Sequence, residues 1–271
     1  MYKRQSGAVF GEKLGWERAN WFADTGEEPR DIYTFGLPNW HSAVAREHKA
    51  AREAAVLFDQ TSFAKYILTG QDAEQALQWI ASNRVDKPVG SIIYTQMLND
   101  NGGIECDLTC VRTKFNEYYI TTGTGYATHD FNWISRNIPS ELNAQLIDVT
   151  SSNAVLSLFG PNARDILQLV TVNDVSDNGH PFGSARQISI AGCLVLAMRI
   201  TYVGELGWEL HLPVEYAQTV YNKLIEAGSP LGLRNAGYRA IETLRLEKGY
   251  RAWSSDIGPD HTPDEAGLGW A

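Results

Sequence analysis

Asp107 has the setting that most suggests chemistry in this 271-residue chain. The segment IECDL (104–108) places a carboxylate among apolar and β-prone residues, directly after a double-glycine turn. Alternation along a strand puts Glu105 and Asp107 on one face, with Cys106 and Leu108 on the other. Two interpretations stay open. Asp107 belongs to a polar outer face, or it points into a cavity near the loop, where it could hold a cationic or N–H-bearing ligand or move a proton.

A second candidate site is the segment RITYVGELGWEL (199–210). Its two glycines give the backbone room for a turn between strands, and Tyr202 and Glu209 lie on either side of that turn. A glutamate can accept two parallel hydrogen bonds from an amidine-like edge, which a 2-aminopyrimidinone such as a pterin presents. An ordinary hairpin with a salt bridge at its rim is the alternative.

Other chemistries lack the residues they need. Gly123-Thr124-Gly125 opens a helix after a strand, and Asp148 follows at the distance of a ribose-binding acid, but the third glycine of a dinucleotide loop is missing. We therefore favour a turn followed by a helix. Cys106 and Cys110 lie on one strand face about 13 Å apart, which is too far to share a metal, and are interpreted as core side chains. The six histidines form no ligand or hydrolase motif, so no metal site is predicted.

Composition indicates a globular protein that stays in water. Hydrophobic residues make up 44% of the chain, and no run approaches the roughly 20 apolar residues of a membrane span. The formal charge of −9 makes nucleic acid a poor partner. Three cysteines without a Cys-x-x-Cys pair, and no secretory signal, fit a reducing, cytoplasmic location.

The pattern of elements predicts an α+β fold, of split-βαβ kind from about residue 145 onward. Residues 1–39, with exposed Trp16 and Trp21, are interpreted as a connector, and no repeat of 20–50 residues is visible. Asn39 and Asp72 are expected to cap helices. Helices are expected over about 40–56, 72–80, 161–170, 216–227 and 237–248, and strands over 63–68, 92–98, 104–111, 118–122, 154–159, 186–190, 194–202 and 208–212.

Several segments together resemble the T-protein (aminomethyltransferase) of the glycine cleavage system. The resemblance is closer to the folate-binding half of flavin-dependent dimethylglycine and sarcosine dehydrogenases, because SGAVFGEKLGWERANWF (6–22) resembles the linker that follows their flavin domain. The matching stretches, in the order of the family, are REAAVLFDQTSFAKYILTG (52–70), YTQMLNDNGGIECDL (94–108), LFGPNARDIL (158–167), RITYVGELGWELHLP (199–213) and LRLEKGYRAWSSDI (244–257).

The resemblance implies a fold, a domain plan and roles for three residues. The fold is a T-protein-like cloverleaf around a folate hole, of which this chain holds the first two lobes, about 40–144 and 145–235. Residues 1–39 are a linker after an absent flavin domain, 40–271 form the folate-binding domain, and the C-terminal barrel is missing. In the family, the aspartate at Asp107 sits beside the reactive nitrogens of tetrahydrofolate, Glu209 binds the pterin edge, and Tyr202 lines the site.

The implied activity is tetrahydrofolate-dependent one-carbon transfer. An iminium or formaldehyde from oxidative N-demethylation of dimethylglycine or sarcosine would be captured as 5,10-methylene-tetrahydrofolate, with FAD held only by the absent flavin domain of the same polypeptide. Ile241 replaces an arginine of the T-protein, so neither that enzyme's donor specificity nor its way of binding folate can be assumed for this chain. Arg199 or Arg245 could face the folate tail. Alternatives are a folate-dependent demethylase or methyltransferase with another donor, or a folate-binding module without turnover. In a eukaryote the expected compartment is the mitochondrial matrix.

Overall fold

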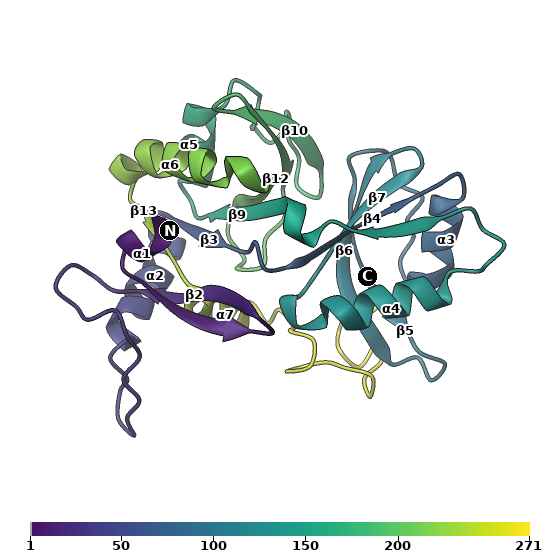
Figure 1. Ribbon diagram of the computed structural model, residues 1–271, viewed down its shortest axis with the longest axis horizontal. Coiled ribbons are helices and arrows are strands. Elements are labelled where there is room, and N and C mark those ends of the chain that lie inside the picture. The colour runs from purple at the N-terminus through teal and green to yellow at the C-terminus, as the bar shows by residue number, and fades with distance from the viewer. Residues whose placement is uncertain (1) are drawn as a thin grey trace. The chain divides into compact units, whose positions relative to one another are not determined.

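The computed structural model describes residues 2–271, which form two compact units. Of the described residues, unit 1 comprises 2–62, 153–182 and 186–250, and unit 2 comprises 63–152, 183–185 and 251–271. Both combine antiparallel strands with helices, so the α+β class expected from the sequence is confirmed (Figure 1). Within residues 2–271, no helix has the length and apolarity that crossing a membrane requires.

Unit 2 is a five-stranded sheet with two helices against one face. The sheet order is β5-β6-β7-β4-β8, and every neighbouring pair is antiparallel. Leu77 of α3 and Ile134 of α4 pack against buried strand residues such as Leu68 and Leu108. The elements are β4 (Ala64–Thr69), α3 (Ala73–Ile80), β5 (Ile92–Leu98), β6 (Ile104–Lys114), β7 (Glu117–Thr122), α4 (Ala127–Asn137) and β8 (Gln145–Asp148).

The other face of β5 and β6 is covered by the end of the chain. Ile257, Ala266 and Leu268 are buried against Ile104 and pack with Tyr94, Leu98 and Trp253. Trp253 also donates a hydrogen bond from its indole Nε1 to the Ile104 carbonyl oxygen, at 2.8 Å. Residues 251–271 therefore lie beside the strand that carries Asp107.

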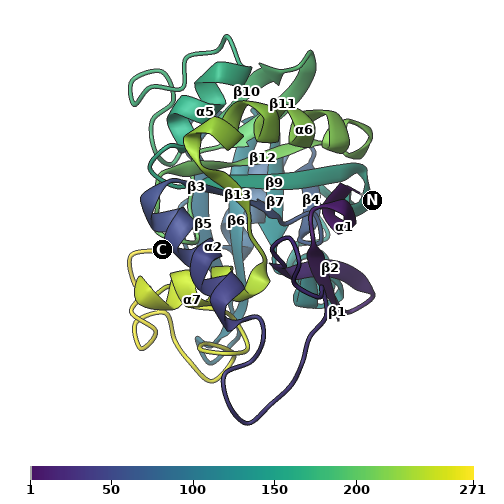
Figure 2. The same ribbon diagram turned by 90° about the vertical axis from the view of Figure 1, so that its left-hand side faces the viewer.

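Unit 1 is built on a six-stranded sheet with helices on both faces. Leu156 and Leu158 of β9 face α5 and α6, whereas Phe159 and Phe58 face α2 and α7. Figure 2 shows α5 and α6 together on one side of this sheet. The order is β10-β11-β12-β9-β3-β13, in which β11-β12, β12-β9 and β9-β3 are antiparallel and β3-β13 is parallel. The elements are α2 (His41–Glu53), β3 (Ala55–Asp59), β9 (Asn153–Phe159), α5 (Ala163–Val170), β10 (Ala185–Ile190), β11 (Cys193–Met198), β12 (Gly207–Pro213), α6 (Ala217–Gly228), β13 (Leu233–Asn235) and α7 (Tyr238–Glu247).

The first 39 residues differ from the expected connector. After α1 (Tyr2–Gln5), strands β1 (Ala8–Lys13) and β2 (Trp16–Phe22) form an antiparallel pair. Trp21, expected to be exposed, is 1% exposed and packs with Val9 and Ala43. Its indole Nε1 donates to Asp31 at 2.8 Å. An alternation of buried and exposed residues this short is hard to distinguish from loop in the sequence alone.

Two expected helix caps are absent, and one helix is shorter than expected. Neither α2 nor α3 has a side-chain cap. Asn39 instead accepts from the Ile32 N–H and donates to the Arg30 carbonyl, which fixes the preceding loop. Asp72 accepts from the Asn143 N–H at 2.8 Å. The helix expected to reach residue 56 ends at Glu53, because β3 begins two residues later and enters the buried sheet.

The two sheets share one plan. Residues 64–148, the first copy, run strand, helix, three strands, helix, strand, and residues 153–228, the second copy, repeat this order up to the second helix. In the second copy β3 pairs with β9 as β8 pairs with β4 in the first. Gly70 and Gly160 close equivalent turns at φ +139° and +132° before α3 and α5. This repeat is longer than the 20–50 residues considered from the sequence.

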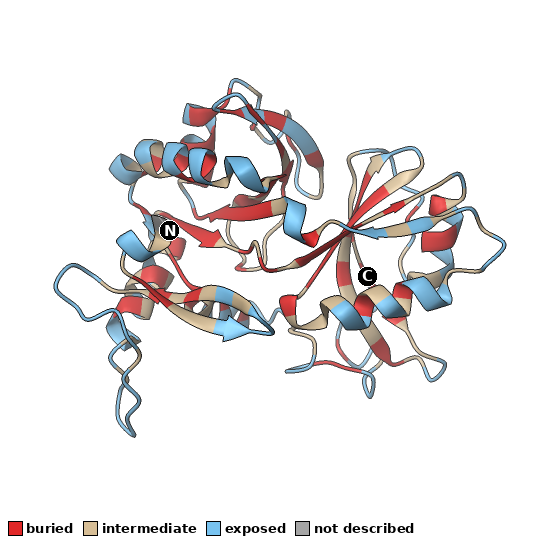
Figure 3. Ribbon diagram, viewed as in Figure 1, coloured by how far each residue is buried: buried red, intermediate tan, exposed pale blue. Residues whose placement is uncertain are grey.

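Side-chain contacts recur at the same spacing. Gln78 accepts from the Val85 N–H and donates to the Asn83 carbonyl. Gln168 does the same with Val175 and Asn173. Burial also matches: Cys106, Leu108 and Cys110 on β6 correspond to Cys193, Val195 and Ala197 on β11, and all six are buried. In both units, Figure 3 shows largely buried strands and helices with exposed outer sides.

Candidate functional site

Asp107 lies on β6 directly opposite Gln96 of β5, in the hairpin predicted from the sequence. Gln96 donates from Nε2 to Asp107 Oδ1 at 3.0 Å, and Tyr94 on the same face adds a second side-chain hydrogen bond. Burial raises the pKa of Asp107 to about 6, while the hydrogen bonds from Tyr94 and Gln96 lower it. The side chain is only partly buried. Asp107 is therefore a positioned carboxylate poised to exchange a proton near neutral pH.

Gln96 and Tyr94 were not identified as site residues from the sequence. Gln96 is fully buried, and its Oε1 has no hydrogen-bond partner among the residues that the structure describes. A buried acceptor without a partner is costly unless a ligand supplies a donor. Pairing the two strands across the five-residue loop 99–103 without a bulge would place Gln96 opposite Cys106, so the sequence alone did not point to its contact with Asp107.

A β-bulge changes the face expected for Glu105. The register shifts between Met97 and Leu98, so that Leu98 pairs with Ile104 while Met97 pairs with Cys106. As a result, Ile104 and not Glu105 shares the face of Asp107. Glu105 accepts from Asn99 Nδ2 at 3.1 Å, and its other oxygen lies 3.4 Å from His129 Nε2. Simple alternation therefore fails at the start of β6.

Glu209 lies in the middle of β12, paired with Met198 on one side and Ser157 on the other. Its side chain is 14% exposed, and Oε2 lies 3.4 Å from Nε2 of His211 on the same face of the strand. The neighbouring Trp208 and Leu210 point into the core. Glu209 is thus a carboxylate on the half-open face of a rigid strand.

The sequence predicted Tyr202 at the end of a strand, but in the structure it belongs to a loop. β11 ends at Met198, and residues 199–206 form an irregular turn before β12. The Tyr202 ring stacks on Tyr250 with centroids 6.2 Å apart. Loops on a rigid scaffold are common positions for ligand contacts.

The structure assigns the three predicted site residues to two units. Tyr202 and Glu209 are in unit 1 and flank the same turn, whereas Asp107 is in unit 2. Arg199 and Arg245, the candidates for a folate tail, are both buried. Arg199 is paired with Asp177, and Arg245 with Glu242. Both guanidinium groups are thus engaged within unit 1.

The Gly123-Thr124-Gly125 segment forms one turn of 3₁₀-helix, Thr124–Tyr126, that leads into α4. Tyr126 packs edge-on against Trp253 and donates its hydroxyl hydrogen to the Trp253 carbonyl at 2.9 Å. Asp148, the expected ribose acid of a dinucleotide site, accepts from the Thr150 N–H. The interpretation as a turn followed by a helix is confirmed. Through Tyr126, this turn also contacts the 251–271 segment that packs on β6.

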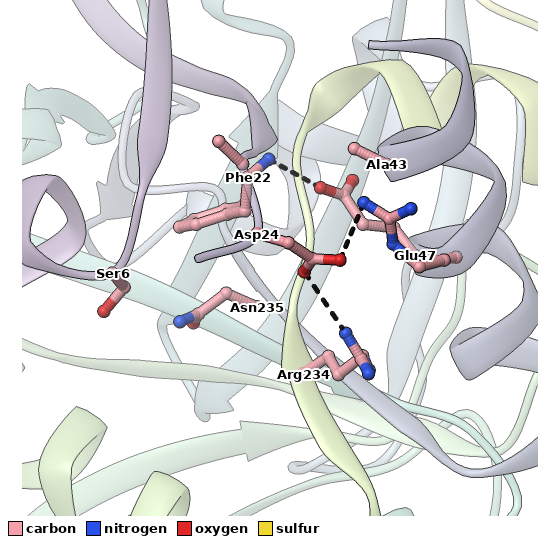
Figure 4. Close-up of a pocket in the computed structure, with 9 residues that line it drawn as sticks. Ser6, Phe22, Asp24, Ala43, Glu47, Arg234 and Asn235 are labelled. Carbon is pink, nitrogen blue, oxygen red and sulfur yellow. Dashed lines mark hydrogen bonds and ion pairs between the residues drawn. The ribbon is translucent and has the colours of Figure 1, made fainter. Parts of the chain in front are cut away.

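A separate pocket of about 140 Å³ lies in unit 1 and is polar. Asp24 is paired with Arg46 at 2.8 Å and with Arg234 at 3.7 Å. Figure 4 shows Asp24 facing Arg234 in this pocket. Glu47 at its floor is 3% exposed and accepts from the N–H groups of Phe22 and Gly237. Burial raises the pKa of Glu47 to about 7. Because chain atoms bind both carboxylate oxygens, we assign Glu47 a structural role.

Comparison with known proteins places the chain in a family. Residues 2–271 match the GCVT N-terminal domain. The chain is 39% identical to human mitochondrial sarcosine dehydrogenase over 97% of its length and 33% of that protein. It is 34% identical to the mouse mitochondrial pyruvate dehydrogenase phosphatase regulatory subunit, over 96% of this chain and 30% of that protein. The chain spans about a third of the length of these relatives.

A solved structure gives the same fold. Aminomethyltransferase T of the glycine cleavage system from Bartonella henselae superimposes with a TM-score of 0.82 at 25% identity, covering 99% of this chain and 66% of that one. The family generally binds tetrahydrofolate. The chain belongs to the GCVT N-terminal domain family, as a T-protein-like folate-binding domain homologous to the corresponding region of sarcosine and dimethylglycine dehydrogenases.

Proposed function

We propose that this domain transfers a one-carbon unit to tetrahydrofolate, using formaldehyde or an iminium from oxidative N-demethylation of sarcosine or dimethylglycine. With formaldehyde, two folate N–H groups are replaced by bonds to one carbon, and the carbonyl oxygen leaves as water. With an iminium, the same two bonds form, and the demethylated amine and one proton leave. Neither route changes the total oxidation state. The observation that carries the proposal is the Asp107 carboxylate, half-buried and held by Gln96 and Tyr94.

Asp107 accepts a proton from the attacking folate nitrogen in this proposal. The hydrogen bonds from Gln96 Nε2 and Tyr94 hold the carboxylate in a fixed orientation toward the substrate. Holding the nitrogen and the one-carbon unit together supplies a further part of the rate gain. Glu209 accepts from the N–H edge of the pterin, and Tyr202 supplies a ring beside it.

The proposal has two parts that separate in one experiment. Tetrahydrofolate binding to the purified chain is measured by calorimetry, and methylene-tetrahydrofolate formation from formaldehyde is measured against the uncatalysed rate. We expect saturable binding and acceleration. Binding without acceleration would favour a folate-binding module, an alternative that the similarity to a regulatory subunit supports. Acceleration only with a sulfonium or similar methyl donor would favour a methyltransferase instead.

A further inference from the structure

A mixed cluster of side chains lies between β6 and α4, apart from the Asp107 face. Cys106, His129 and Asp130 each offer one donor atom, and these atoms lie within 4.8 Å of one another. His129 Nδ1 is 2.9 Å from Asp130 Oδ1, and the Cys106 thiol donates to the same carboxylate. The cluster lies entirely in unit 2.

The second copy shows that the fold does not need these polar groups. The position of Asp130, fourth in α4, is occupied by Val220 in α6, and the position of Thr122 by Leu212. Val220 and Leu212 are buried in an apolar core. The first copy therefore buries a carboxylate where the same architecture packs with aliphatic side chains. Burying a carboxylate is costly unless bonded groups compensate it.

We propose that Cys106, His129 and Asp130 bind a divalent metal ion of the Zn²⁺ class. Thiolate, imidazole and carboxylate are the ligands that Zn²⁺ takes in proteins, at about 2.0–2.3 Å. A tetrahedral ion with these bonds holds its ligand atoms roughly 3–4 Å apart, so the observed cluster needs only a small contraction. Three protein ligands leave the fourth position open to water or a substrate atom.

Surrounding groups orient the ligands as outer partners of metal sites do. Thr122 donates its hydroxyl hydrogen to Asp130 Oδ2 at 2.5 Å, which leaves Oδ1 turned toward His129. Glu105 lies 3.4 Å from His129 Nε2, so it fixes the tautomer in which Nδ1 binds the metal. Trp253 packs beside the imidazole with centroids 5.6 Å apart. The His129 side chain is 41% exposed, which gives an ion a route in.

Binding also has a defined proton balance. The Cys106 thiol must lose its proton to coordinate, and that proton passes to solvent as the metal–sulfur bond forms. No oxidation or reduction is involved. No sequence motif marks this site, because Cys106 lies on strand β6 whereas His129 and Asp130 lie on helix α4 more than 20 residues later.

The test is metal titration of the purified chain. We expect wild type to bind one Zn²⁺ per chain in competition with a chelator, and Co²⁺ to give the absorption of thiolate coordination. Cys106→Ser and His129→Gln should each weaken Zn²⁺ binding by more than about 100-fold, and Glu105→Gln by about 10-fold. His129→Gln changes a half-exposed ring and should leave folding intact.

Matched controls come from the repeat. Cys193→Ser removes the equivalent buried thiol of the second copy, and Cys110→Ser removes the next inward thiol on β6. Both should keep wild-type affinity. Absence of stoichiometric binding in wild type, unchanged affinity in His129→Gln, or an equal loss in Cys193→Ser would each overturn the proposal. None of these readouts depends on folate chemistry, so failure here leaves the proposed function standing.

Discussion

The two copies of the strand and helix repeat share their scaffold and differ at several polar residues on their strands and second helices. Gly70 and Gly160, or Gln78 and Gln168, make the same contacts at equivalent turns. Asp107, by contrast, corresponds to Leu194, because Cys110 and Ala197 lie opposite Ile120 and Leu210 at equivalent places. Residues that the copies share therefore build the fold, whereas residues that they do not share are candidates for function.

Glu209 is a residue of the second copy that the first copy does not share. Its counterpart on β7 is Tyr119, which is 6% exposed. Each copy thus carries one carboxylate on a strand where the other carries an apolar or aromatic side chain. A raised pKa alone does not separate functional from structural carboxylates. The pKa of Glu47 is also raised, yet both of its oxygens accept hydrogen bonds from backbone N–H groups.

The largest effect is expected from Asp107→Asn, which keeps the size of the side chain and removes its charge and basicity. Methylene-tetrahydrofolate formation should fall by about 10²–10⁴-fold, while folate affinity changes little. Rates measured as folate is raised to saturation distinguish lost chemistry from lost binding. Leu194→Asn, at the equivalent exposed position of the second copy, is the control and should be silent. An unchanged rate in Asp107→Asn would place Asp107 on a merely polar strand face.

Gly70→Ala and Gly160→Ala test whether the shared turns carry equal weight. A Cβ at either position would overlap a backbone carbonyl oxygen, of Asn143 or of Ala54, and φ is in the left-handed region. Each change should cost about 3 kcal/mol or more in the free energy of unfolding. Gly26→Ala, at φ +91° with no atom near the added Cβ, isolates the cost of φ and should lose about 1–2 kcal/mol. Urea unfolding measures all three, and a large difference between Gly70→Ala and Gly160→Ala would contradict equivalence.

Helices α2 and α7 give the second copy a layer that the first lacks, and Glu47 holds this layer together. Its pKa of about 7 lies above the usual 4.5, so the folded state binds the extra proton between these values. Stability should fall as pH rises from 4.5 through 7, by at most about 3 kcal/mol. Arg46 opposes this shift in the pKa and Asp24 adds to it. Urea unfolding at several pH values should show a flatter profile for Glu47→Gln, and the same slope in the variant would refute the assignment.

Glu209→Gln tests the carboxylate of the second copy. One acceptor oxygen becomes an NH₂ donor facing the donor edge of the pterin, so tetrahydrofolate binding should weaken by about 10- to 150-fold. Calorimetry measures the loss. Glu205→Gln changes the same turn, where Glu205 is paired with Arg52 at 2.9 Å, and should leave folate affinity unchanged. Equal affinities for wild type and Glu209→Gln would return Glu209 to the rim of an ordinary hairpin.

Sequence patterns were most informative where one local rule decides the outcome. The strand 92–98 was predicted with its observed bounds, because a β-rich run ends at an Asn/Gly-containing loop. They failed where a neighbour in space decides. β13 is three residues long and exists because it pairs with β3, which is distant in the sequence. Asn39 has the residue type of a helix cap but is used by the Ile32 and Arg30 backbone.

The candidate site divides in the same way. Asp107 and Glu209 were predicted on strands, and both lie there. The bulge at Glu105 and the loop around Tyr202 were not predicted, because a bulge adds one residue without leaving a composition signal. The Cys106, His129 and Asp130 cluster needs the packing of α4 on β6, which alternation and spacing do not encode.

The smallest effects are expected from Gln78→Ala and Gln168→Ala, which are the finest test of the shared scaffold. Each glutamine is exposed on its helix, yet it accepts one backbone hydrogen bond and donates another to the loop that follows. Losing both bonds at a solvent-accessible position should cost about 1 kcal/mol. Gln75→Ala, exposed on α3, is the matched control and should stay within about 0.5 kcal/mol of wild type. Urea unfolding should give nearly equal losses for the two variants, with folate binding unchanged. A loss confined to one copy would show that equivalent hydrogen bonds do not contribute equally to stability, and that the two copies are stabilised by different contacts.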